Sequence, residues 1–309
     1  MALVYIAGVV VLVLLCFVAL NYVFPEFTAR QLLALRLKSM GVADKRLQIS
    51  GFTIAYWELG EGEPLLLVHG MGADRGTLLE VAGKLKSKYR VILPDLPGFG
   101  DSDKPETADY GIESQVNNLR QIIAALGLQR VHLGGHSMGG WISAGLASSS
   151  PELIASLWLI AAAGTSDIEH SVAMDAWKRG DYVLCARTPA DVRGIMKLAM
   201  VKVPPLPYCI WEMLGRRAAA NYTLHKRIFD RIMADVEGYA LDKRLPAIKA
   251  PTLLMWGDSD RLVPPAALET CKRLIPNAQP ILMPNIGHVP QMEAIDRSAA
   301  DYIAFRQSI

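Results

Sequence analysis

The stretch that most constrains how this chain can fold is residues 131–140, which read VHLGGHSMGG. An apolar strand pattern runs into Gly134 and Gly135, and a helical pattern follows Ser137. Glycines two places before and after the serine, Gly135 and Gly139, leave room for a sharp turn from which the hydroxyl projects. The pattern predicts a nucleophile elbow at Ser137, although a glycine-rich loop that simply contains a serine would read the same in isolation.

Composition narrows the class of protein. The 309 residues are 51% hydrophobic and 20% charged with a net charge of +2, so the chain can bury a large core and no nucleic-acid partner is expected. The four cysteines are scattered without metal-ligand spacing and predict neither a disulfide framework nor a zinc site. His132 and His136 straddle a strand and a turn, so they do not form a zinc pair either. We expect no metal and no cofactor.

The first 24 residues carry no charged side chain. A helix of that length spans roughly 36 Å, more than the about 30 Å of a hydrocarbon core. We expect a retained transmembrane helix rather than a cleaved signal peptide, because no basic residue precedes the run and no A-x-A site closes it.

Residues 25–46 are expected to form a juxtamembrane helix. Its basic residues Arg30, Arg36 and Lys38 either meet anionic headgroups or lie on a solvated face while the leucines pack on the domain. Because the nearby positive charge follows the span, the positive-inside rule favours, on few charges, a cytoplasmic catalytic domain at the inner membrane of a bacterium.

Short apolar runs alternate with helical patterns in the rest of the chain. Strands are expected at 65–68, 91–93, 131–133, 157–161, 252–256 and 280–283, and helices at 78–85, 112–126, 139–147, 266–275 and 293–305. Nearly continuous apolar strands separated by helices predict a parallel sheet covered on both faces. Residues 47–49 and 53–59 predict an antiparallel hairpin that leads into this sheet.

In such sheets ligands bind beyond the carboxyl ends of the strands. Five expected strand ends are followed by unusual segments: His69-Gly70-Met71-Gly72, residues 94–102, the elbow, residues 257–261 and residues 284–288.

In order and spacing, these segments resemble the α/β-hydrolase family. The resemblance covers residues 51–309 and implies an α/β-hydrolase fold, a mostly parallel sheet covered by helices. With the apolar N-terminal helix included, the whole chain resembles membrane-anchored lipases, among them bacterial phospholipases A and animal monoacylglycerol lipases.

The resemblance implies a catalytic triad of Ser137, His288 and Asp260. A serine hydroxyl needs a base to accept its proton, and the base needs a third group to hold it in one tautomer. Asp258 is the nearby alternative for the acid, and Asp167 is a more distant one. The family's oxyanion hole would use the backbone N–H groups of Met71 and Met138. His69, His136, His132 and His225 are interpreted as structural, and the loop 95–102 as a structural turn.

The strand-helix alternation stops between residues 165 and 240. Helices expected at 172–178, 190–201, 208–220 and 224–236 predict a cap inserted into the core, whose two parts are residues 47–164 and 241–309. Leu198, Met200, Leu206 and Trp211 are candidates to line an acyl-chain tunnel, or they form the core of the cap itself.

The sequence therefore favours a membrane-anchored serine carboxylester hydrolase that cleaves acyl esters of glycerolipids, with phospholipid or lysophospholipid first and monoacylglycerol second. A general carboxylesterase, a C–C bond hydrolase with the same triad, and a non-catalytic membrane receptor or scaffold are the alternatives. The expected partners are the lipid substrate, the bilayer and, through the apolar helix, a second copy of the chain.

Overall fold

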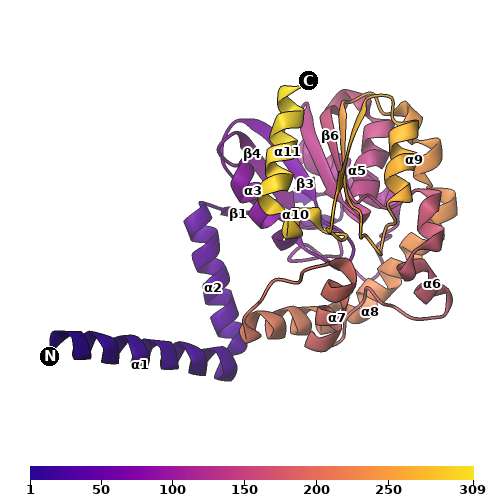
Figure 1. The fold of residues 1–309 in the computed structure, drawn as a ribbon. Coiled ribbons are helices and arrows are strands. Elements are labelled where there is room, and N and C mark those ends of the chain that lie inside the picture. Colours follow the sequence, from indigo (N-terminus) through magenta and orange to yellow (C-terminus); the bar gives the residue numbers. More distant parts are fainter.

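An eight-stranded sheet runs through the computed structural model, which describes the backbone of residues 1–309 and all side chains except those of Leu3, Leu14, Phe17, His170 and Glu237 (Figure 1). Its strands are β1 (Ala43–Ile49), β2 (Phe52–Leu59), β3 (Glu63–Val68), β4 (Tyr89–Pro94), β5 (Val131–His136), β6 (Ile154–Ile160), β7 (Thr252–Gly257) and β8 (Ala278–Met283). Their order is β1-β2-β4-β3-β5-β6-β7-β8. Strand β2 is antiparallel to β1 and β4, and the pairs from β4 through β3 to β8 are parallel. The expected hairpin and parallel sheet are confirmed.

Both faces of the sheet are covered at its centre, which explains why strands such as β3, β6 and β7 are buried and mostly apolar. In β3, Leu65 and Leu67 pack into one core cluster, whereas Leu66 and Val68 pack into another on the opposite face. Helices α3 (Leu79–Leu85), α10 (Pro290–Glu293) and α11 (Ile295–Gln307) lie on the first face. Helices α4 (Ile112–Ala125), α5 (Met138–Ser149) and α9 (Ala266–Leu274) lie on the second (Figure 1). The helix expected at 293–305 is α11, displaced by two residues, and the short helix α10 precedes it.

Three helices lie between β6 and β7: α6 (Val172–Lys178), α7 (Pro189–Ala199) and α8 (Tyr208–Gly238). The two helices expected at 208–220 and 224–236 are one continuous helix of 31 residues. The weak helix formers between them do not interrupt it, since intrinsic propensity is a weak preference that the packing of a long helix overrides.

The N-terminal helix α1 (Ala2–Val23) projects away from the rest of the molecule with its apolar side chains exposed (Figure 1). It is long and apolar enough to cross a membrane. Helix α2 (Pro25–Met40) begins at a proline, turns back to the domain and packs along α8. The helix expected over 25–46 ends at Met40, because Gly41 takes a left-handed conformation with φ of 70° and β1 begins at Ala43.

Candidate active site

Ser137 stands at the turn between β5 and α5 in a strained conformation, with φ of 54° and ψ of −118°. Its N–H donates to the Ile160 carbonyl at 2.9 Å, and its carbonyl accepts from the Ala163 and Trp141 amides at 3.1 and 3.0 Å. Backbone strain of this kind persists only where the surroundings fix it, and it is concentrated at functional sites. The end of β6 and the first turn of α5 fix it here, as a nucleophile elbow requires.

The two glycines around the serine are needed for close backbone approach. A Cβ on Gly135 would lie 2.2 Å from the Gly139 carbonyl oxygen, and one on Gly139 would lie 2.3 Å from that of Val68. Any side chain at either position would force the elbow open. This explains why a glycine stands two residues before and two residues after Ser137.

His288 and Asp260 form a buried pair. Asp260 Oδ2 lies 2.8 Å from His288 Nδ1, and its Oδ1 accepts from the Leu262 and Val263 amides, both at 2.9 Å. A carboxylate at Nδ1 holds the proton on that nitrogen, so Nε2 is left unprotonated and can act as a base.

The two alternative acids lie elsewhere. Asp258 is exposed and accepts from the Ser259 hydroxyl and the Asn285 amide, both at 2.8 Å. Asp167 lies in a short 3-10 helix, Ser166–His170, beyond β6. The structure therefore brings Asp260, rather than either alternative, to His288.

Ser137 and His288 line one pocket together with Met71 and Met138. The first N–H groups of a helix have no intrahelical acceptor, and Met138 is the first residue of α5. The pocket thus contains a hydroxyl, an imidazole and the two residues whose amides are expected to form the oxyanion hole. Its remaining wall is almost entirely apolar: Trp141, Ala163, Ile168, Ser171, Ala173, Met174, Leu184, Phe229, Ile232, Met233, Leu262 and Val263.

The four cap residues expected to line an acyl tunnel lie outside this pocket lining. Leu198 and Met200 pack against the main core cluster, Leu206 is half-buried, and Trp211 packs under Arg193 at 5.0 Å. Leu198 and Met200 thus contribute to core packing, and the tunnel role of the four residues stays a prediction. The cap side of the pocket comes instead from residues 168–184 and from the second half of α8, where the helical spacing of residues 229, 232 and 233 was the available signal.

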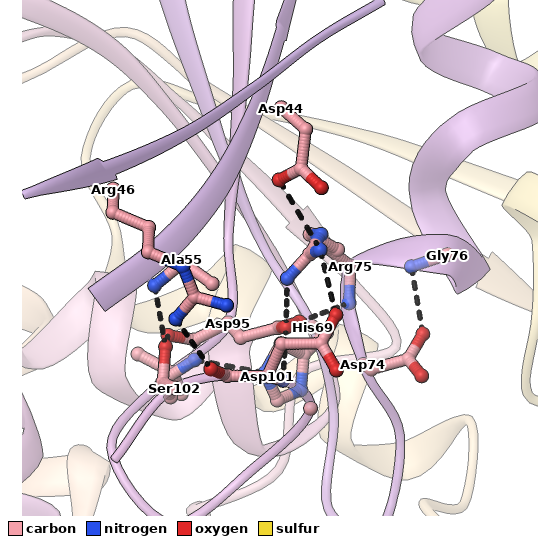
Figure 2. A network of polar contacts seen from close by, with 12 residues as sticks. Asp44, Arg46, Ala55, His69, Asp74, Arg75, Gly76, Asp95, Asp101 and Ser102 are labelled. Atoms are coloured by element: carbon pink, nitrogen blue, oxygen red, sulfur yellow. Dashed lines mark hydrogen bonds and ion pairs between the residues drawn. The ribbon is translucent and has the colours of Figure 1, made fainter. Parts of the chain in front are cut away.

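A network of ion pairs surrounds Arg75, four residues after Met71 in the sequence (Figure 2). The Arg75 guanidinium binds Asp95 and, at 2.8 Å, Asp101, and the Arg75 amide donates to Asp95 Oδ1 at 2.8 Å. Trp57 covers the guanidinium at 4.4 Å. Arg75 and Asp95 are both buried, so this pair joins the loop after β3 to the turn 95–102, in keeping with the structural role expected for that turn. Arg75 itself was missed, because a single arginine in a sequence gives no such signal.

Two histidines beside the site form hydrogen bonds with the backbone. His69 Nδ1 donates to the Gly70 carbonyl at 2.8 Å, while its Nε2 accepts from the Leu96 amide at 3.1 Å. His136 Nε2 donates to the carbonyl oxygen of His288 at 2.9 Å. Burial, and then the neighbouring His288, hold the pKa of His136 well below its ordinary value, so this ring stays neutral.

The profile of the alpha/beta hydrolase fold matches residues 63–295. The chain belongs to the α/β-hydrolase family. Among the residues that the structure describes, no group of three or more His, Cys, Asp or Glu side chains is arranged to hold a metal ion.

Relatives of this α/β hydrolase include lipases. Lipase 1 of Psychrobacter immobilis is 37% identical over 276 residues, which cover 88% of this chain and 84% of that protein. The crystal structure of a membrane phospholipase A, a bacterial virulence factor, superposes with a TM-score of 0.88 at 35% identity and covers 98% of each chain. Monoacylglycerol lipase ABHD6 of Bos taurus is 23% identical over 319 residues, which cover 98% of this chain and 93% of that protein. The α/β hydrolase is thus of the lipase and esterase type, a carboxylester hydrolase.

Proposed function

We propose that this α/β hydrolase cleaves acyl esters of membrane glycerolipids through an acyl-enzyme on Ser137. One observation carries the proposal: a strained serine and a histidine paired with a buried aspartate share an apolar pocket in a molecule whose N-terminal helix is long enough to span a bilayer. An apolar wall suits an acyl chain, and a membrane anchor keeps the pocket near its lipids.

In the proposed first half-reaction, His288 Nε2 accepts the proton of the Ser137 hydroxyl as the oxygen attacks the ester carbonyl. The negative oxygen that forms accepts hydrogen bonds from the Met71 and Met138 amides. Asp260 stabilises the imidazolium without taking its proton. The imidazolium then protonates the departing alcohol, and the acyl group remains on Ser137.

In the second half-reaction, His288 takes a proton from water, which attacks the acyl-serine and releases the fatty acid. Each proton that the base accepts is returned within the same half-reaction, so the cycle consumes one water for each ester. The proposed cycle thus uses Ser137, His288 and Asp260, the two backbone amides and one water.

The finer substrate is proposed as phospholipid or lysophospholipid, with monoacylglycerol as the second candidate. The similarity to a membrane phospholipase A supports this order, because its identity is 35% against 23% for the monoacylglycerol lipase, and both similarities extend over 98% of this chain and therefore include the region of α1. We further propose that α1 crosses the membrane once. The basic residues Arg30, Arg36 and Lys38, which follow α1, support a cytoplasmic domain. Pairing of two chains through α1 stays a prediction.

The test uses the full chain in detergent and measures hydrolysis of a short soluble ester, a long-chain phospholipid, a lysophospholipid and a monoacylglycerol. We expect a fluorophosphonate probe to label the wild-type chain and not a folded Ser137→Ala variant, whose activity on every ester is lost. Folded wild-type chain that is not labelled would exclude the serine mechanism. Hydrolysis of the short ester without any long-chain lipid would exclude the lipid substrate and leave a general carboxylesterase.

A further inference from the structure

Glu293, the last residue of α10, joins two segments that are far apart in the sequence. Its Oε1 accepts from the Gly287 amide at 2.8 Å, next to His288. Its Oε2 accepts from the Val201 amide at 2.7 Å and from the Lys202 amide at 3.2 Å, just beyond the end of α7. One carboxylate therefore bridges the histidine loop, residues 284–289, and the segment that leaves helix α7.

The main chain around His288 makes further contacts with the same segment. The His288 amide donates to the Ala199 carbonyl at 2.6 Å, and a Cβ on Gly287 would lie 2.4 Å from that oxygen. On the other side, the His288 carbonyl accepts from His136 Nε2 at 2.9 Å. The base candidate is thus held through its backbone by the end of α7 and by the residue that precedes Ser137.

We propose that Glu293 is a positioning residue that couples helix α7 to the catalytic histidine. The inference rests on the proposed role of His288. Because the carboxylate binds both segments at once, a displacement of residues 199–202 moves Gly287 with it and shifts the imidazole relative to Ser137. A misplacement of about 1 Å at a reacting group can cost about 100-fold in rate. The His288 imidazole is in position when residues 199–202 contact the histidine loop, and it moves away from Ser137 when those residues move.

The chemistry of the link requires a carboxylate. Three N–H groups point at Glu293, and an ionised carboxylate offers only acceptors on both oxygens. A glutamine of the same length would present its NH₂ group to one of the two ends, so it could hold either the histidine loop or the segment after α7 but not both. Glu293→Gln therefore removes the coupling with little change in volume.

The kinetic test compares Glu293→Gln and Glu293→Ala with wild type on a short soluble ester, using the full chain in detergent. We expect kcat to fall about 10- to 100-fold with KM within about twofold, because the base is misplaced while the pocket wall is unchanged. Glu269→Gln is the matched control: this glutamate lies on α9, is 69% exposed and pairs with Lys272 at 3.9 Å. Its kcat should equal that of wild type.

A second measurement does not depend on activity. Hydrogen exchange should become faster in Glu293→Ala at both linked segments, residues 199–202 and 286–289, while β5 and α5 stay as protected as in wild type. In Glu293→Gln the exchange should become faster at only one of the two segments, because the remaining amide oxygen can still accept from the other. Wild-type kcat in both Glu293 variants, or faster exchange in only one segment of Glu293→Ala, would overturn the coupling. Faster exchange at both segments in a chain that hydrolyses no ester would support the coupling and reject the proposed function.

Discussion

The two oxygens of Asp260 have different tasks. Oδ2 faces His288 Nδ1 at 2.8 Å, while Oδ1 is held by the amides of Leu262 and Val263. The second set of bonds prevents the carboxylate from rotating, so the imidazole is oriented by a group that is itself fixed. Asp258, two residues earlier, instead joins the turn after β7 to Asn285.

This difference gives a prediction for the two aspartates. Asp260→Asn should keep the fold and lower kcat by about 10⁴-fold on a short ester, because an amide can favour the wrong imidazole tautomer. Asp258→Asn should stay within about threefold of wild type, since its side chain contacts only a turn. Esterase rates of both folded variants, measured in parallel, decide the matter. An equal loss in the two variants would mean that the acid has been assigned to the wrong residue.

Among the elements, α1 and α2 are joined to α8 by specific contacts. Asn21, a polar residue near the end of the apolar helix, is buried and accepts from the Cys209 amide at 3.0 Å. Tyr22 stacks on Tyr208 with ring centroids 4.9 Å apart. The first turn of a helix has amides without intrahelical acceptors, so Asn21 satisfies one of them for α8. The proposed anchor is thus fixed to the helix whose second half lines the pocket.

Asn21→Val should loosen this joint. The variant leaves the Cys209 amide without its acceptor, a loss of about 1 to 3 kcal/mol for a buried donor. We expect faster hydrogen exchange at residues 207–210 and earlier proteolytic cleavage in the loop before α8, with labelling of Ser137 unchanged. Val18→Ala, at an exposed position of α1, serves as the control and should leave both measurements as in wild type.

The local patterns predicted the strands and helices of the sheet, because a strand buried on both faces appears in the sequence as a continuous apolar run. The ends of the helices were harder to predict. Gly41 ends α2 through a left-handed backbone, and residues 221–223 continue α8 although their helix propensities are weak. The residues proposed as the triad each follow a strand and stand in a recognisable motif. The pocket wall depends on how α8 lies over the core, which no local pattern of Leu198 or Trp211 could reveal.

In the molecule as a whole, α8 also rests on the core through an aromatic stack. His225 lies on Phe99 with centroids 5.1 Å apart, and Phe99 contacts His69 in turn at 5.3 Å. Burial, and then the nearby Lys104 ammonium, lower the pKa of His225 to about 4. Because the ring stays neutral while folded, protons bind preferentially to the unfolded chain as the pH falls.

The stability of the fold should therefore depend on pH through His225. In the unfolded chain the pKa of His225 is about 6.5. The contribution of the neutral ring to the free energy of unfolding is therefore fully present above pH 6.5 and is lost as the pH falls towards 4. The loss amounts to about 3 kcal/mol between pH 7 and pH 4. The glutamine in His225→Gln cannot titrate. Between pH 7 and pH 4 the unfolding free energy of the variant should therefore fall less than that of wild type, by the same amount. Denaturant unfolding of both chains in detergent measures this difference. The lowered pKa values of His132 and His136 affect both chains and cancel in the comparison. If the unfolding free energies of the two chains changed equally with pH, the packing of α8 on the core would not keep His225 neutral.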